Sequence, residues 1–284
     1  MHYLHPDVWS EVSMYLSGED LGILCSSNRG ICRYILNRTT CLYYSKRVTC
    51  LFQSFPNLNT LTCSEFEHGV NVSSLPNTLT VLSLPKDCML TDDDLCNLPP
   101  FLTYLNLRWN NKITDEGISY LPLSLTYLNL EWNYKITDEG ISYLLPSLTY
   151  LNLSCDGNIT DAGICYLPRS LLSLGYSRDI TDAGVRYLPR CLSSLKLGYN
   201  NNITDVGVAD LPRFLTYLDL GSNQNMTDKA VRDLPPSLTY LDLWKNDNIT
   251  DAGLINLPRS LTYLHLNFRQ KVRHKITGIF VNIC

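Results

Sequence analysis

The chain has 284 residues, of which 45% are hydrophobic, and its formal net charge at pH 7 is −4. This apolar content is typical of a folded protein and excludes a disordered one, and the mild negative charge argues against nucleic-acid binding through phosphate neutralisation. No run approaches the roughly 18 consecutive apolar residues that a membrane span needs, so we expect no membrane partner.

The first segment, residues 1–40, has the spacing of short amphipathic helices. Val8, Val12 and Leu16 recur at helical intervals, and the stretch SGED that follows ends one helix and favours the start of another. Residues 29–36 are expected to form a third helix. Helices this short need a partner or a neighbouring domain to pack on.

This segment resembles an F-box, which has a Pro near its start, an apolar first helix ending in Tyr-Leu, then Asp-Leu and an Arg-containing last helix. F-boxes dock onto a Skp-type adaptor of cullin–RING ubiquitin ligases, so the resemblance implies an adaptor-binding segment. The docking residues that it implies are Leu4, Pro6, Val8, Trp9, Val12 and Leu16. The alternative is a helical cap that shields the first of the following repeats from solvent.

Residues 41–78 contain weak, irregular copies of a leucine-containing sequence motif, which becomes regular from Leu79 onward. The motif then recurs every 23 residues, with a single step of 21 between Leu171 and Leu192. A fixed period of this length predicts a solenoid whose units stack on one another. We therefore expect connecting repeats at 41–78 and a repeat array with a C-terminal cap at 79–284.

Each repeat reads Leu-x-x-Leu-x-Leu-x-x-Asn-x-x-Ile-Thr-Asp-x-Gly-Ile-x-x-Leu-Pro. The alternating first part predicts a strand with Leu102, Leu105 and Leu107 pointing inward. The threonine, Thr114 in this repeat, is a good helix N-cap, and the acidic residues after it suit the positive end of a short helix. Pro122 then ends the helix.

Two further columns of the repeat predict close contacts. A buried Asn side chain can donate to and accept from turn backbone groups that would otherwise be unpaired. Gly costs a helix about 1 kcal/mol relative to Ala, so its recurrence indicates that space is short between neighbouring helices. The glycines are Gly117, Gly140, Gly163, Gly184, Gly207 and Gly253, with Ala230 in the remaining late repeat.

These residues resemble leucine-rich repeats, specifically the subclass with an ITDxG signature that is often called cysteine-containing. The signature begins at Ile113, Ile136, Ile159, Ile180, Ile203 and Ile249. The resemblance implies an α/β solenoid with a curved parallel sheet inside and short helices outside, preceded here by the small all-α segment.

The outward side chains of the strands and of the turns after them form columns rich in aromatic and polar groups, a composition typical of protein-binding surfaces. We expect a protein target to contact Tyr104, Asn106, Arg108, Trp109, Tyr127, Asn129, Glu131, Trp132, Tyr150, Asn152, Tyr217, Asp219, Tyr240, Asp242, Trp244, Tyr263 and His265. The alternative is that the tyrosines only pack against one another as good strand residues. Ser173, Gly175 and Ser194 interrupt the column and predict either a pocket floor or a weak repeat.

No residue pattern predicts catalysis, a metal or a cofactor. The five histidines lack metal-ligand spacing, and no phosphate-binding Gly loop or G-x-S-x-G motif occurs. The eleven cysteines include no C-x-x-C pair, so we expect reduced, mostly buried thiols. With no secretory signal at the start, the expected location is the cytoplasm, with the nucleus as the alternative.

The two resemblances together imply a substrate-recognition subunit of a Skp–cullin–F-box type ubiquitin ligase. Such a subunit binds an adaptor through its F-box and a protein target through its repeats. The alternative is a non-ligase interaction module or scaffold in which the N-terminal helices only cap the solenoid.

Overall fold

The structure is a computed structural model that describes residues 41–44, 55–63, 72–86, 88–154, 158–175, 179–267 and 279–283. The chain divides into two compact units, Met1–Asn133 and Tyr134–Cys284. The predicted helical segment 1–40, with its six adaptor-docking residues, lies outside the described residues.

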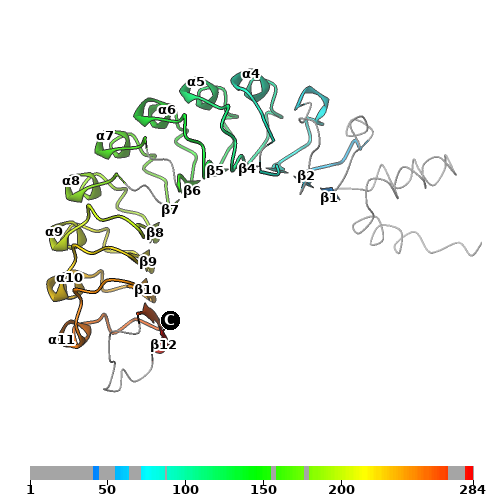
Figure 1. Cartoon of the computed structure of the whole chain (residues 1–284). Helices are drawn as coiled ribbons and strands as arrows, with labels where there is room; N and C mark the ends of the chain where they lie inside the picture. The colour runs from blue at the N-terminus through cyan, green and yellow to red at the C-terminus, as the bar shows by residue number, and fades with distance from the viewer. Residues whose placement is uncertain are drawn as a thin grey trace, which may run out of the picture. The chain divides into compact units, whose positions relative to one another are not determined.

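The described strands of the first unit form a parallel sheet in chain order, and its short helices lie on the outer side of that sheet (Figure 1). The predicted connecting segment 41–78 contributes two of these strands. The elements are β1 (Cys41–Tyr44), β2 (Thr60–Cys63), the 3-10 helix η2 (Val72–Ser74), β3 (Val81–Ser83), α4 (Asp92–Leu95), β4 (Tyr104–Asn106), α5 (Asp115–Ile118) and β5 (Tyr127–Asn129).

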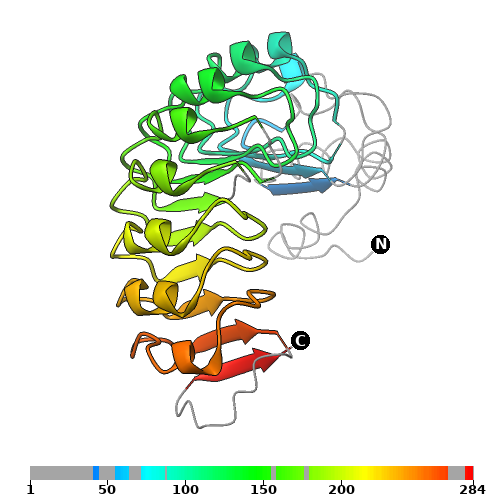
Figure 2. The same ribbon diagram turned by 60° about the vertical axis from the view of Figure 1, so that its left-hand side comes forward.

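The second unit repeats this arrangement. Its strands, coloured green to red in Figure 2, lie side by side in parallel register, with the helices along one side. The elements are α6 (Asp138–Ser142), β6 (Tyr150–Asn152), α7 (Asp161–Ile164), β7 (Ser173–Gly175), α8 (Asp182–Val185), β8 (Ser194–Lys196), α9 (Asp205–Ala209), β9 (Tyr217–Asp219), α10 (Asp228–Asp233), β10 (Tyr240–Asp242), α11 (Asp251–Leu254), β11 (Tyr263–Leu266) and β12 (Phe280–Ile283). The predicted α/β solenoid of parallel strands and short outer helices is confirmed.

The core of each unit consists of the leucine columns that the repeat pattern predicts. Leu102, Leu105 and Leu107 are all 0% exposed, and the same three positions are buried in the other repeats wherever the structure describes a Leu there. Full burial of such a side chain contributes about 1.5–3 kcal/mol, so these columns supply the main driving force for stacking.

A pair of hydrogen bonds from Thr to Asp joins neighbouring repeats at six junctions of the described chain. In α8 and α9, the backbone N–H and the Oγ1 hydroxyl of Thr204 donate to the two carboxylate oxygens of Asp182 at 2.8 and 2.6 Å. The same two bonds link Asp92 to Thr114, Asp138 to Thr160, Asp161 to Thr181, Asp205 to Thr227 and Asp228 to Thr250.

This link adds a role that the helix-dipole argument does not contain, because the acidic residue also bonds to the following repeat. Thr160 and its equivalents also accept a capping bond from the second helical N–H, as predicted. Thr114 occupies the N-cap position and its hydroxyl donates to Asp92 like its equivalents, but its side chain accepts no capping bond.

The same carboxylate explains the glycine column. A Cβ on Gly207 would lie 2.2 Å from Oδ1 of Asp182, far inside van der Waals contact. The corresponding distances at four other glycines are 2.1–2.3 Å, at Gly117, Gly163, Gly184 and Gly253. The predicted shortage of space is confirmed. Ala230 takes this position in α10, where its own N–H donates to Asp205 Oδ1 at 3.2 Å.

The predicted Asn column is also confirmed as a buried ladder. Its members are at most 1% exposed, at Asn110, Asn133, Asn200, Asn223 and Asn246. Asn246 Nδ2 donates to Leu220 O at 2.9 Å, and Asn246 Oδ1 accepts from Asn223 N–H at 2.9 Å. The amide therefore both donates to and accepts from the backbone of the preceding repeat.

The cysteines are less buried than expected. Among the cysteines whose side chains the structure describes, Cys63 and Cys88 are buried, while Cys96, Cys165 and Cys191 are exposed, and these five are free thiols. Cys191 stands where other repeats have Ser and donates to Leu171 O at 3.1 Å, so a hydrogen bond at the surface explains its position. Burial raises the pKa of Cys63 to about 12, which makes it an inert core residue.

No helix in the described part of the chain is long and apolar enough to cross a membrane.

We expect Gly207→Ala to destabilise the protein by about 1–2 kcal/mol, because the added methyl group overlaps the Asp182 carboxylate. Ala normally stabilises a helix relative to Gly, so the sign of the effect is diagnostic. Urea unfolding followed by circular dichroism measures it. In the double variant with Asp182→Ala, the methyl group should cost nothing further, and strictly additive losses would contradict this explanation.

Candidate functional site

The tyrosine column lies on the strand side of each unit. In-register pairing places Tyr104 beside Tyr127, and their rings stack with centroids 4.0 Å apart. In the second unit, Tyr240 stacks on Tyr217 at 4.2 Å and on Tyr263 at 4.6 Å. The rings support one another, as the packing alternative requires, yet each residue stays partly exposed. Stacking therefore holds the rings rigid and leaves part of each accessible.

One member of this column was not predicted from the sequence. Phe280 in β12 is paired with Tyr263 in the sheet, and its ring stacks at 5.5 Å from the tyrosine ring. Phe280 lies outside the regular 23-residue period, so the alignment of repeats does not reveal it. Its side chain is 67% exposed.

The side chains two positions after the tyrosines also point outward, and their oxygens accept hydrogen bonds from the backbone. Oδ1 of Asp219 accepts from Gly221 N–H at 3.0 Å, and Oδ1 of Asp242 accepts from Trp244 N–H at 2.8 Å. Asn106, Asn129 and Asn152 each make the same bond to the second residue onward. This turn-forming role was missed by the sequence analysis, although short polar side chains at strand ends commonly play it. Asn129 is only 8% exposed, which leaves little of it for a target to touch.

Acidic residues and a histidine meet near the end of the described array. His265 Nδ1 lies 2.9 Å from Asp242 Oδ2. Burial raises the pKa of Asp219, and the charge of Asp242 raises it further, against opposing effects of the Gly221 N–H, Lys196 and His265. Burial likewise raises the pKa of Tyr217, assisted by Tyr240 and the nearby aspartates, so its phenol remains a neutral donor.

In the first unit, the structure brings together four predicted target-binding residues, which we call the tryptophan cluster: Arg108, Trp109, Glu131 and Trp132. The two indole rings stack at 4.4 Å, and Arg108 Nε lies 3.2 Å from Glu131 Oε2. Glu131 also accepts from Trp132 Nε1 at 3.2 Å. The arginine side chain is 48% exposed, so the cluster presents an accessible cation that Glu131 links to Trp132.

Both tryptophans of this cluster have left-handed backbone conformations, with φ of 63° at Trp109 and 64° at Trp132. This region is uncommon for bulky residues and costs roughly 1–2 kcal/mol per residue. A hydrogen bond from Trp109 N–H to Glu131 O, at 2.8 Å, helps to hold the conformation. Tyr199, Ser222 and Lys245 have the same conformation at the same position of their repeats, so the turn of the repeat imposes it.

Trp244 lies in the second unit within a different group. Lys245 Nζ is 4.1 Å from its ring centroid, and the ring of Tyr199 meets it edge-on at 6.3 Å. Tyr199 was missed by the sequence analysis. It occupies the same repeat position as Trp109 and Trp132, with φ of 61° and an exposed fraction of 61%, so alignment of that column would have identified it.

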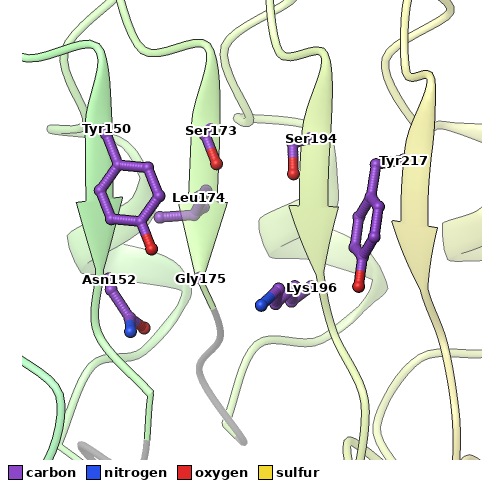
Figure 3. Close-up of a pocket in the computed structure, with 8 residues that line it drawn as sticks. All are labelled: Tyr150, Asn152, Ser173, Leu174, Gly175, Ser194, Lys196 and Tyr217. Carbon is purple, nitrogen blue, oxygen red and sulfur yellow. The ribbon is translucent and has the colours of Figure 1, made fainter.

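Between Tyr150 and Tyr217 the column is interrupted by Ser173 and Ser194, and a pocket of about 230 Å³ fills the gap (Figure 3). The lining is completed by Asn152, Leu174, Gly175 and Lys196. Of the two sequence interpretations, the structure supports the pocket floor. Across the described ranges, no three His, Cys, Asp or Glu side chains are grouped so that they could hold a metal ion.

A family description of leucine-rich repeats matches residues 99–121, 123–145, 189–211, 212–234 and 235–257. The chain forms leucine-rich repeats. A search of curated proteins found no match.

Several solved structures share the leucine-rich-repeat fold. A chain from the crystal structure of the Rad7 and Elc1 complex of yeast is 19% identical, with a TM-score of 0.65 over 97% of this chain and 77% of that one. The internalin InlF of Listeria monocytogenes is 19% identical, with a TM-score of 0.51 over 94% of this chain and 89% of that one. CroV588, a circular leucine-rich-repeat protein, is 19% identical with a TM-score of 0.52, covering 86% of this chain but 40% of its own. Identities at this level show the shared fold.

We expect Asp219→Asn to become more stable relative to the wild type as the pH rises from about 4 towards 7. The Asp219 pKa is raised in the folded state, so its neutral form favours folding at low pH, and this contribution is lost as the carboxyl ionises. Asn stays neutral and keeps an oxygen for the Gly221 N–H. Urea midpoints measured across this pH range test the effect, with exposed Asp247→Asn as the matched control. A difference from wild type that shrinks with rising pH would contradict it.

Proposed function

We propose that the chain is the substrate-recognition subunit of a Skp–cullin–F-box type ubiquitin ligase. Residues 1–40 bind the adaptor, and the strand side of the repeats holds a protein target. The contribution to catalysis is proximity, because the subunit brings the target to the enzymes that transfer ubiquitin.

The observation that carries the proposal is the row of rigid, partly exposed aromatic rings along parallel strands. Tyr and Trp are enriched among residues that dominate binding energy at protein interfaces, as is Arg. Rings that are already stacked lose little conformational freedom when a partner docks, so more of the contact energy remains as affinity. The concave strand side of a solenoid is also where repeat proteins commonly bind partners.

The adaptor part of the proposal has a separate basis in the F-box resemblance around Pro6, Trp9 and Leu16, directly ahead of the repeats. The yeast structure with the same fold is a complex of Rad7 with Elc1, which supports the view that such arrays work as subunits. The rival function is an interaction module with the same target face and no adaptor.

Replacement of Trp9 and Leu16 by Ala should abolish binding of a purified Skp-type adaptor, because both side chains belong to the apolar docking surface that the F-box resemblance implies. Pull-down with a known F-box protein as positive control measures this. Circular dichroism should show the repeats unchanged. If the wild-type chain fails to bind under conditions where the control binds, the ligase function is wrong and the interaction module stands.

For the target face, we expect Tyr240→Ala to weaken target capture about tenfold or more, since its ring lies between two others in the column. Partners identified by proximity labelling supply the target for the binding assay. Tyr187→Ala is the matched control, because this tyrosine follows the outer helix α8 and is 50% exposed. Loss of the stacking should cost about 1 kcal/mol of stability. Unchanged capture with lowered stability would favour a tyrosine column that serves packing alone.

A further inference from the structure

The gap in the tyrosine column has the dimensions of missing rings. Four successive strands, β6 to β9, present Tyr150, Ser173, Ser194 and Tyr217 at paired positions. With strands about 4.8 Å apart, the two tyrosines are separated by three steps, or about 14 Å. Stacked tyrosine rings in the filled parts of the column lie 4.0–4.6 Å apart, so two rings are absent from this interval.

The pocket is large enough to hold a guest ring in place of a missing one. Its volume is about 230 Å³, and a cavity of roughly 150 Å³ accepts benzene. Gly175 lets the side chain of Asn152, its partner on the neighbouring strand, pack directly against the backbone of β7. A Cβ on Gly175 would lie 2.4 Å from Asn152 Oδ1, so the opening is fixed by close packing.

The lining has two kinds of chemistry. Tyr150 and Tyr217 flank the pocket, and Figure 3 shows the Tyr150 ring face-on, with an edge towards the gap, and the Tyr217 ring turned more nearly edge-on. The Ser173 and Ser194 hydroxyls lie at one end of the pocket. At the other end Lys196 supplies the single formal charge of the lining, with its Nζ 5.9 Å from the Tyr217 ring centroid. Lys196 is exposed and forms no ion pair with a described residue.

The orientation of the tyrosine side chains relates the aromatic part of the lining to Lys196. Figure 3 shows the Tyr150 hydroxyl directed towards Asn152, and the Tyr217 hydroxyl on the side where Lys196 lies. A guest ring stacked in the same direction would bring its outer edge beside the lysine ammonium. A single negative group next to the guest ring would neutralise the charge of Lys196. A phosphate dianion fits less well than a carboxylate, because Asp219 on the adjacent strand, which already attracts Lys196, repels a double negative charge more strongly than a single one.

We infer that this pocket receives an aromatic side chain of the protein target, with a carboxylate of a neighbouring target residue placed at Lys196. The inference rests on the proposed function of the strand face. It identifies the kind of target group that one part of this face binds. The ring completes the interrupted column by stacking, which contributes about 0.5–1.5 kcal/mol beyond its buried area. The carboxylate supplies direction and selectivity.

Short peptides test the pocket independently of any natural target. The probes are acetyl-Glu-Tyr-Glu-amide, acetyl-Glu-Leu-Glu-amide, acetyl-Lys-Tyr-Lys-amide and the first peptide with phosphotyrosine, titrated into the full chain and followed by NMR. The first peptide should bind about tenfold tighter than the leucine and lysine peptides. Ser194→Tyr replaces one lining hydroxyl by a ring that fills the gap and should abolish binding, while Lys196→Gln should remove the preference for Glu over Lys. Tyr187→Ala is the control.

Each other outcome overturns the inference. Equal binding of the leucine peptide, or unchanged binding by Ser194→Tyr, eliminates the aromatic pocket. About tenfold tighter binding of the phosphotyrosine peptide eliminates the carboxylate in favour of a phosphate. Failure of all four peptides eliminates the site. If Ser194→Tyr still captures the natural target while Tyr240→Ala does not, the pocket inference fails and the proposed function survives.

Discussion

The arrangement of the strand face depends on how one repeat is fixed to the next. The decisive link is the pair of hydrogen bonds that a threonine donates to the aspartate carboxylate of the preceding repeat. The acceptor is charged and receives two donors, which makes the link stronger than a neutral hydrogen bond. Because the carboxylate occupies the space beside the next helix, only a very small residue fits there. A single constraint therefore accounts for Thr, Asp and Gly in the ITDxG signature.

Two other ladders act at different places around each coil. Buried Asn side chains hold the turn after the strand, and a Ser hydroxyl before the strand donates to the preceding repeat, as Ser260 does to Leu238 O at 2.6 Å. Three links at separate points oppose both sliding and rotation of a repeat. The shortened repeat beginning at Leu171 keeps the pattern, since Thr181 still donates to Asp161 at 2.8 and 2.6 Å. The strands consequently stay in register through an irregularity in length.

Much of this organisation was predictable from the sequence, because it depends on periodicity within one repeat. Inward leucines, outward tyrosines and the close approach at glycine all follow from the motif itself. The Asp–Thr link was not recognised, because a helix-dipole role explains the same residue without any partner 22 positions away. The left-handed tryptophans contradict ordinary residue preference, and Phe280 belongs to no regular repeat. Burial of Asn129 depends on its neighbours, which alternation along one strand does not specify. Whether residues 1–40 bind an adaptor stays a prediction.

Regularity and recognition place opposite demands on such a surface. Identical repeats present the same side chains along the array. A partner displaced by one repeat would meet nearly the same chemistry, so no single binding position would be preferred. Departures from the consensus remove this degeneracy. The tryptophan cluster adds a cation beside two indoles, the Ser173–Ser194 gap adds a pocket with one lysine, and the Asp242–His265 pair adds an acidic group. The recurring hydrogen-bond ladders set the geometry, and the repeats that depart from the pattern give each position a distinct chemical identity that a target can select.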